Sequence, residues 1–419
     1  MNAEPKYPRL ATPLLRQALA ESPVVLIHGP RQCGKTTLAQ TVGEELGYSY
    51  FSFDDAVTMS AAKSDPVGFV DDLPERTILD EVQRAPALFT TLKRAVDRDR
   101  RPGRFLLTGS ANVLLLPTLA DSLAGRIEIL RLHPLSQCEL TRAEPGFLDA
   151  LFEHGFKLRP YQRLGSDLIR RIVAGGYPSA LARSTPRRRA TWYRDYVETL
   201  VQRDVRDLAR VSSIDAIARL LALAASQTAR LINVSDLAAP FNLSRPTIRE
   251  YVTLLERMFL LEELPPWHNN RLSRLIKTPK LHLTDTGVAC SLLGLDEASL
   301  AHDRELMGQL LETFVVQELK RQATWRDDDI RFHHLRDKDG VEVDLVIEQG
   351  GRSLAAVEVK ASATVTEKDF RAIRKLQGVA GKRFTCGVVL YDGEASIRFG
   401  EGLYAVPIRA LWETTQTHD

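Results

Sequence analysis

The chain has 419 residues, which is too long for one ordinary hydrophobic core, so its length predicts two or three domains. Its composition, 44% hydrophobic and 26% charged, is typical of a soluble globular protein. Lysine and arginine total 56 against 54 acidic residues, which argues against a uniformly basic, nucleic-acid-binding surface. The four cysteines are far apart, and no segment has the apolar length of a signal-peptide core or a membrane span. We therefore expect a cytoplasmic protein with no disulfide framework, no structural zinc and no membrane partner.

Short apolar segments rich in β-branched residues alternate with helical patterns over the first part of the chain. This alternation predicts an open, mostly parallel α/β sheet. Helices are expected over 8–20, ending before Pro23, and over 36–46, after a glycine-rich turn. The strands are predicted at 24–28, 48–53, 77–79, 104–107 and 127–130.

The glycine-rich turn reads GPRQCGKT and matches G-x-x-x-x-G-K-[ST] at each fixed position, between an apolar strand and a helix. Glycines let successive backbone N–H groups point at phosphates, and the helix N-terminus adds its positive dipole. Lys35 is expected to reach the β- and γ-phosphates as a catalytic cation, and the Thr36 hydroxyl to bind Mg²⁺. The pattern therefore predicts an ATP site formed by Gly29, Pro30, Arg31, Gln32, Cys33, Gly34, Lys35, Thr36 and Thr37.

Two acids follow the predicted strand 77–79, at the edge of the sheet where ligands of such sheets collect. Asp80 is expected to hold the Mg²⁺ through water. Glu81 is expected to polarise the attacking water as the general base. The alternative is a surface pair that caps the next helix, which is the weaker interpretation so soon after a phosphate-binding loop.

The next strand ends in further polar residues that are candidates for the reacting phosphate. Ser110 and Thr108 are the candidates for contact with the γ-phosphate or the attacking water, with Asn112 behind them, and a simple strand-end turn is the alternative. Arg126 precedes the last strand of the sheet. An arginine there can act in trans on the nucleotide of a neighbouring subunit by stabilising charge in the transition state.

Taken together, these segments resemble the AAA+ ATPases, and more narrowly a bacterial and archaeal family that joins such an ATPase to a C-terminal domain of unknown function. The resemblance covers nearly the whole chain, in the same order. It implies a P-loop ATPase core at 1–145, a helical lid and connector at 146–210, and assembly into a ring or other homo-oligomer. The matching pieces are GPRQCGKTT, LDEVQRAP, FLLTGSAN, LAGRIEIL, HPLSQCEL, GGYP, the helix from Trp192 to Asp207, Thr247 to Leu264, and KLHLTDTG.

Residues 211–275 are interpreted as a winged-helix-like module. Ser244 precedes a helix that has proline in its first turn and an apolar stripe at helical spacing. If this helix enters a DNA major groove, Arg245, Thr247 and Arg249 lie near bases or phosphates. Five arginines and five acids balance between 229 and 271, so a structural or protein-contacting module is an equal alternative.

The last part, 276–419, is expected to form a smaller α/β domain. Asp344 and the segment Glu358-Val359-Lys360 resemble the D…E-x-K signature of restriction-endonuclease-like folds. If Glu348 pairs with Leu354 in a hairpin, Asp344 lies opposite Glu358, where two carboxylates can hold a metal ion and Lys360 can act on water. Glu312, on the helix before, is a further candidate ligand. The alternative is an amphipathic hairpin whose charges face solvent.

The leading interpretation is an oligomeric, Mg²⁺-dependent ATPase that couples turnover to a nuclease-like, DNA-engaging C-terminal half. One alternative is a regulatory switch in which ATP controls assembly and hydrolysis is slow. The other is a protein remodeller whose C-terminal half is an inactive, protein-binding module. Turnover that rises with DNA favours the first interpretation, and stimulation by protein but not by DNA favours the last.

Overall fold

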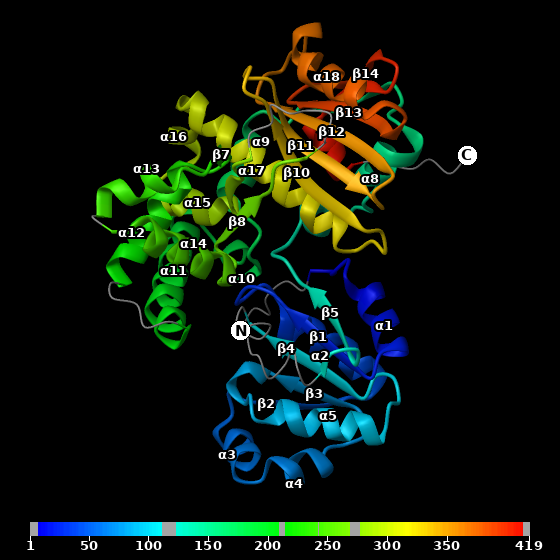
Figure 1. Ribbon diagram of the computed structural model, residues 1–419, viewed down its shortest axis with the longest axis vertical. Helices are drawn as coiled ribbons and strands as arrows, with labels where there is room; N and C mark the ends of the chain where they lie inside the picture. The colour runs from blue at the N-terminus through cyan, green and yellow to red at the C-terminus, as the bar shows by residue number, and fades with distance from the viewer. Residues whose placement is uncertain (1–6, 111–122, 209–213, 242, 269–276, 414–419) are drawn as a thin grey trace.

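The computed structural model describes residues 7–110, 123–208, 214–241, 243–268 and 277–413. Figure 1 shows one sheet at the bottom, a group of helices at the left and a second sheet at the top. Across these described ranges, no helix is long and apolar enough to cross a membrane.

The N-terminal sheet consists, within the described residues, of β1 (Val24–His28), β2 (Ser49–Ser52), β3 (Thr77–Asp80), β4 (Phe105–Gly109) and β5 (Ile127–Arg131). All are parallel, in the order β2-β3-β4-β1-β5. Each strand lies within two residues of its expected bounds, and the predicted parallel α/β sheet is confirmed. The helical segments are α1 (Thr12–Glu21), α2 (Lys35–Leu46), α3 (Ala56–Ser64), α4 (Pro66–Asp71), the short η1 (Val82–Arg84) and α5 (Leu88–Arg98).

Helices cover both faces of this sheet, which explains why its central strands read as continuous apolar segments. Successive side chains of β1 point to opposite faces. Val24 and Leu26 pack in a cluster with α5, and Val25 and Ile27 pack in another with α1 and α2. The carboxyl ends of β1, β3 and β4 therefore meet at one edge, beside the start of α2.

A chain of short elements leaves the sheet and leads into the helices at the left of Figure 1. The residues Gly175, Gly176 and Tyr177 separate α9 from α10. These elements are α7 (Gln137–Thr141), α8 (Phe147–Asp149), the π-helical turn η3 (Ala150–His154), β6 (Arg159–Pro160), α9 (Ser166–Ala174), α10 (Pro178–Leu181) and α11 (Pro186–Leu208).

The middle region contains a small antiparallel sheet, of order β7-β9-β8 over the residues described. Ser244 caps its helix as expected, Asn233 caps α13, and Val252 and Leu255 are buried. Its elements are α12 (Ile214–Ser226), β7 (Arg230–Leu231), α13 (Val234–Ala238), η4 (Ala239–Phe241), α14 (Arg245–Arg257), β8 (Leu261–Leu264), β9 (Lys280–Leu283), α15 (Thr286–Leu292), α16 (Glu297–His302) and α17 (Arg304–Ala323).

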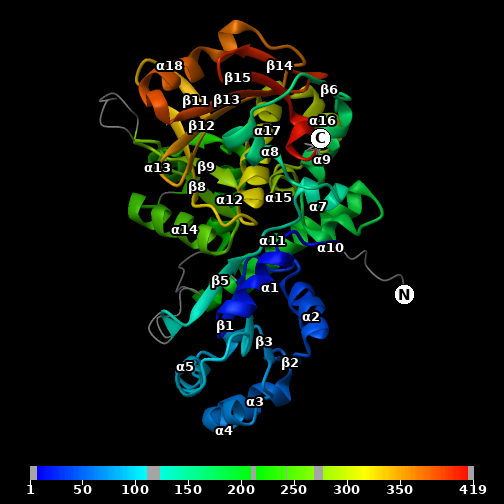
Figure 2. The same ribbon diagram turned by 90° about the vertical axis from the view of Figure 1, so that its right-hand side faces the viewer.

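The C-terminal sheet has the order β10-β11-β12-β13-β15-β14-β6 among the described strands, so β6 joins it from much earlier in the chain. Figure 2 shows α18 on one side of this sheet and α17 on the other. Its elements are β10 (Ile330–Arg336), β11 (Glu342–Gln349), β12 (Ser353–Lys360), η5 (Glu367–Phe370), α18 (Arg371–Ala380), η6 (Gly381–Arg383), β13 (Phe384–Tyr391), β14 (Ala395–Gly400), β15 (Leu403–Pro407) and η7 (Ile408–Leu411).

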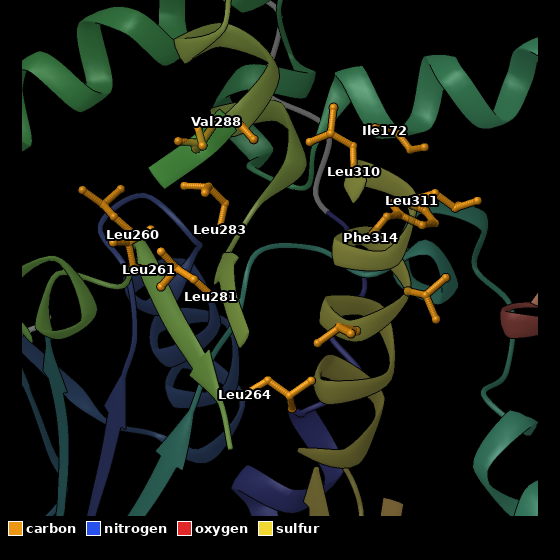
Figure 3. Close-up of a cluster of buried hydrophobic side chains, with 14 of the residues drawn as sticks. Ile172, Leu260, Leu261, Leu264, Leu281, Leu283, Val288, Leu310, Leu311 and Phe314 are labelled. Carbon is orange, nitrogen blue, oxygen red and sulfur yellow. The ribbon is translucent and has the colours of Figure 1, made fainter. Parts of the chain in front are cut away.

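One buried apolar cluster extends from Cys138 to Trp412 and joins the middle region to the C-terminal sheet. Figure 3 shows part of it, where leucines of β8 and β9 lie beside α15 and α17. The cluster crosses residues 210 and 275, and the division of the chain at these positions stays a prediction.

Candidate functional site

The phosphate-binding loop connects β1 to α2, and its shape depends on two glycines. A Cβ on Gly29 would lie 2.1 Å from the carbonyl oxygen of Leu132, so this position excludes any side chain. Gly34 has φ of 101° directly before α2, a left-handed conformation that favours glycine. The buried Lys35 ammonium donates to the carbonyl oxygens of Gly29 at 3.0 Å and Pro30 at 2.8 Å. The loop therefore forms a compact turn with its lysine held at the rim.

Asp80, at the end of β3, lies next to Thr36. The Thr36 hydroxyl donates to Asp80 Oδ1 at 2.9 Å, and Thr108 also donates to this oxygen. The Tyr50 hydroxyl donates to the other oxygen, Oδ2, at 2.8 Å; burial and this bond raise the pKa of Tyr50 to about 12. A hydroxyl and a carboxylate side by side at the loop are the oxygen donors that Mg²⁺ prefers, so Thr36 and Asp80 fit the ion.

Glu81 lies in a strained turn after β3, with φ of 58°. Its backbone N–H donates to Thr108 Oγ1 at 3.2 Å. The Gln83 amide bridges two predicted catalytic residues, because it donates to a carboxylate oxygen of Glu81 and to Ser110 Oγ, the latter at 2.9 Å. Gln83 was not among the residues predicted from the sequence, although it lies two positions after Glu81 in the segment LDEVQ.

The loop opens into a cavity of about 540 Å³ that has walls from two regions of the chain. Lys35, Thr36 and Glu81 line one wall. Trp192 and Tyr196 of α11 line the other, with ring centroids 5.0 Å apart and planes at 10°. Pro178 and Ser179 of α10 line the same cavity. The volume lies within the roughly 300–1,000 Å³ that small-molecule sites span.

Sequence reasoning did not assign α11 to this site. Tyr196 donates to the carbonyl oxygen of Arg31 in the loop at 3.1 Å and also lies 3.2 Å from the Tyr177 hydroxyl. The available signal was the spacing of Trp192 and Tyr196, because residues four apart share one face of a helix. Cys33 differs from its neighbours in the loop, since its side chain is buried in the sheet core.

Two other candidates for ATP chemistry lie outside this arrangement. The Arg126 guanidinium pairs with Asp97, Nε to Oδ1 at 2.6 Å, away from the residues that line the cavity of its own chain. Asn112 lies outside the described residues. The role of Arg126 in a neighbouring subunit stays a prediction.

The three candidates for DNA contact lie at the start of α14. Arg245 is exposed there. The Thr247 hydroxyl is 2.8 Å from that of the capping Ser244. Arg249 pairs with Glu263 at 2.5 Å, so its charge is already matched within the chain.

The C-terminal candidates come together as the expected hairpin register requires. Glu348 pairs with Leu354, and Leu345 with Val357. Asp344 Oδ2 accepts a hydrogen bond from the backbone N–H of Val359 at 2.9 Å. Lys360 Nζ donates to Glu358 Oε1 at 2.8 Å, while Glu358 Oε2 is buried without a partner among the described residues.

A lysine that the sequence analysis did not consider lies among these carboxylates. Lys280 Nζ, from the start of β9, is 2.7 Å from Glu312 Oε1 and 3.4 Å from Asp344 Oδ1. Burial alone lowers the pKa of Lys280, but the surrounding carboxylates outweigh it and the net shift is upward. Burial and the neighbouring Asp344 raise the pKa of Glu358 to about 8. Among the described residues, no group of three or more histidine, cysteine or acidic side chains is arranged to hold a metal ion.

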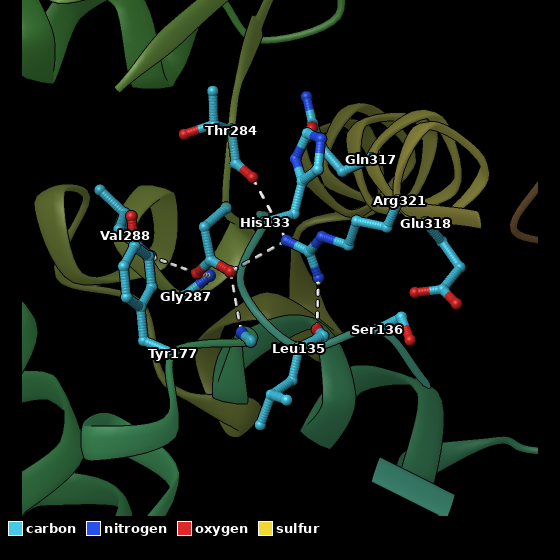
Figure 4. A network of polar contacts seen from close by, with 12 residues as sticks. His133, Leu135, Ser136, Tyr177, Thr284, Gly287, Val288, Gln317, Glu318 and Arg321 are labelled. Carbon is cyan, nitrogen blue, oxygen red and sulfur yellow. Dashed lines mark hydrogen bonds and ion pairs between the residues drawn. The ribbon is translucent and has the colours of Figure 1, made fainter. Parts of the chain in front are cut away.

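A polar hub connects the segment after the N-terminal sheet with the middle region and α17 (Figure 4). At its centre, Arg321 donates to the carbonyl oxygen of Leu135 at 2.7 Å and pairs with Asp285 at 3.2 Å. Asp285 Oδ2 also accepts from the backbone N–H of Gly176 at 2.8 Å. The segments GGYP and TDTG therefore meet at one buried ion pair.

Three known families match separate parts of the chain. A family described as "AAA domain" matches residues 21–141. Residues 165–299 match "Domain of unknown function (DUF8612)". Residues 307–411 match "Domain of unknown function (DUF4143)".

Relatives along the full length include the uncharacterized proteins Mb2031c of Mycobacterium bovis and Rv2008c of Mycobacterium tuberculosis. Each is 28% identical over 407 residues, which cover 97% of this chain and 85% of the relative.

Solved structures give weaker overall similarity. The Walker-type ATPase PABY2304 of Pyrococcus abyssi is 15% identical, with a TM-score of 0.42, over 67% of this chain and 94% of that one. The RuvB Holliday junction branch migration motor of Thermotoga maritima is 20% identical, with a TM-score of 0.31, over 62% and 93%. The family match over 21–141 and the geometry of the loop together support an AAA-type ATPase domain in the N-terminal region. The chain therefore combines an AAA-type ATPase domain with a C-terminal domain of unknown function.

Proposed function

We propose that the protein binds ATP with Mg²⁺ between the phosphate-binding loop and α11, hydrolyses it with Glu81 as the base, and couples turnover to its C-terminal half. The cavity with walls from two regions carries this proposal, because a nucleotide there contacts both Lys35 and Tyr196. A ligand shifts a conformational equilibrium when it binds one arrangement better than another. ATP in this cavity would therefore favour the arrangement in which α11 closes on the loop.

The residues around the cavity have separate roles in this proposal. The Lys35 ammonium, now held by loop carbonyls, would donate to the β- and γ-phosphates, together with the N–H groups at the start of α2. Bound Mg²⁺ would neutralise charge on these phosphates, held by Thr36 and Asp80. Glu81 would accept a proton from the attacking water, and Gln83 would position Glu81 relative to Ser110.

The proposal extends to a homo-oligomer in which Arg126 acts in trans. Arg126 is partly exposed and absent from the lining of its own chain's cavity. An arginine that reaches the γ-phosphate of a neighbour stabilises charge that develops in the transition state.

For the C-terminal half, the proposal is a winged-helix-like module followed by a nuclease-like, DNA-engaging domain. The helices α12 to α14 with β8 support the first, and the exposed Arg245 lies where a recognition helix would begin. The position of Asp344 beside β12 and the Lys360–Glu358 bond support a nuclease-like fold for the second. Glu312 and Asp344 already contact the ammonium of Lys280, so the proposal includes no metal-dependent step at this site.

A second candidate function is an ATP-controlled switch or protein remodeller whose C-terminal half binds protein and has no nuclease activity. One observation favours it: Glu312 and Asp344 already contact the ammonium of Lys280. The two candidates predict different stimulators of turnover, DNA in the first case and a protein partner in the second.

ATP turnover by wild type and Glu81→Gln, with and without double- and single-stranded DNA, tests the proposal, with DNA integrity followed in the same samples. Glu81→Gln should bind ATP and lose roughly 10²–10⁴-fold in turnover, the usual contribution of a general base. Glu44→Gln, an exposed glutamate on α2, is the matched control and should turn over normally. Near-normal turnover by Glu81→Gln would place the base elsewhere, and DNA-independent turnover with intact DNA would favour the second candidate.

A further inference from the structure

Lys280 lies at the centre of a cluster of acidic side chains in the interior of the protein. Its side chain is only 2% exposed. Its ammonium is 2.6 Å from Glu342 Oε1, 2.7 Å from Glu312 Oε1 and 3.4 Å from Asp344 Oδ1. The ammonium donates hydrogen bonds to Glu312 and Asp344 and forms an ion pair with Glu342, so three carboxylates surround one cation.

The same carboxylate oxygens would have to bind a metal ion. Glu312 and Asp344 are two of the three ligands proposed for a divalent cation, and each directs an oxygen at Lys280. The remaining oxygen of Asp344 accepts the backbone N–H of Val359. A divalent cation at this position would lie beside an ammonium group in a buried environment, where repulsion between like charges is weakly screened. The two cations therefore compete for one site.

The backbone holds Lys280 in place from both sides. In the small sheet, Lys280 pairs with Leu231 of β7 and Leu264 of β8. Leu281 and Leu283 of the same strand are buried in the cluster shown in Figure 3, close to the helix that carries Glu312. The ammonium is thus supplied by a fixed strand of the middle region, in contrast to a mobile surface lysine.

We propose that the ammonium of Lys280 is the resident cation of this carboxylate cluster and takes the place of a divalent metal. As folded, the C-terminal domain then binds no catalytic metal at Glu312, Asp344 and Glu358 and does not cleave DNA by a metal-dependent reaction. The inference concerns the C-terminal domain and is independent of ATP hydrolysis by the N-terminal one. It predicts that removal of Lys280 creates a metal site that the natural protein lacks.

Mn²⁺ binding measured by electron paramagnetic resonance, without nucleotide, tests this in wild type, Asp344→Asn, Lys280→Met and Lys280→Met/Asp344→Asn. Wild type and Asp344→Asn should bind the same amount of Mn²⁺. Any weak Mn²⁺ binding at the ATP site is common to both proteins and cancels in the comparison. Lys280→Met should gain a site that the double variant lacks. A site in wild type that Asp344→Asn removes would overturn the proposal, and so would a folded Lys280→Met that gains none.

A second measurement needs only the wild-type protein, since Lys280→Met leaves buried carboxylates unpaired and can fail to fold. Acylation of amines, followed by mass spectrometry, reports which lysines are accessible. Lys277 is exposed and three positions away, so it serves as an internal control. Lys280 should stay unmodified with and without Mn²⁺ while Lys277 reacts. An increase in Lys280 labelling on addition of Mn²⁺ would show that the metal displaces the lysine, and would overturn the proposal.

Discussion

Replacement of Arg321 by methionine tests whether the polar hub holds the regions of the chain together. The Arg321 side chain is 7% exposed, and its guanidinium donates to the carbonyl oxygens of Leu135 at 2.7 Å and Thr284 at 3.3 Å. It also pairs with the buried Asp285 at 3.2 Å. Methionine keeps an unbranched side chain of similar bulk but cannot donate a hydrogen bond. The variant therefore removes the polar contacts and keeps most of the packing.

The size of the effect follows from what is left behind. A buried group that loses its partner costs about 1–3 kcal/mol, and removal of one member of a buried ion pair costs about 3–5 kcal/mol. Asp285 keeps hydrogen bonds from the N–H groups of Gly176 at 2.8 Å and Gly287 at 2.9 Å, which still stabilise its charge. We therefore expect a loss of about 3–5 kcal/mol in the free energy of unfolding, less than the sum of the separate costs.

Equilibrium unfolding in urea measures this loss. Arg304→Met, at the exposed start of the same helix, is the matched control and should change the free energy of unfolding by less than about 0.5 kcal/mol. A cycle with Asp285→Asn then measures the coupling between Arg321 and Asp285. A loss below about 1 kcal/mol for Arg321→Met, or no coupling in the cycle, would refute the reasoning.

Three further predictions concern the ATP site. Lys35→Ala should abolish ATP binding in a fluorescent-nucleotide titration. Lys63→Ala, which changes an exposed lysine of α3, is the control and should bind ATP normally. Unchanged ATP affinity in Lys35→Ala would overturn the assignment of the ATP site. Tyr196→Phe removes the hydroxyl that donates to the Arg31 carbonyl oxygen and should weaken ATP binding by about 0.5–1.5 kcal/mol. Unchanged ATP affinity in this variant would contradict the role assigned to Tyr196. Burial, Arg131 and Lys35 lower the pKa of His28 to about 4, so the unfolded chain takes up the proton first as pH falls below about 6.5. The free energy of unfolding should therefore decrease by about 2 kcal/mol between pH 7 and pH 5 because of His28. If the free energy of unfolding depends on pH in the same way in wild type and His28→Gln, His28 makes no such contribution.

The sequence predicted the parts of the fold that local patterns determine. Short apolar strands, the glycine-rich turn and the acids at the end of β3 are each encoded within a few residues, and the β11–β12 register followed from one short connection. The walls supplied by α11, the bridge through Gln83 and the ammonium of Lys280 depend on contacts between distant segments. Lys280 and Asp344, for example, are 64 positions apart. A single sequence does not reveal contacts between distant segments, so it does not show which lysine enters the carboxylate cluster.

The strand β6 has a consequence for how the protein can be made. Ser396, at the start of β14, donates to the carbonyl oxygen of Lys157, 239 positions earlier. Chains leave the ribosome at about 5–20 residues per second, so the segment around β6 waits roughly 10–50 s for its partner during translation. The ATPase sheet is complete once Arg131 has emerged. The N-terminal domain can therefore fold while synthesis continues, whereas the C-terminal sheet closes only at the end, and a gene fragment that begins after β6 would encode that sheet without its last strand.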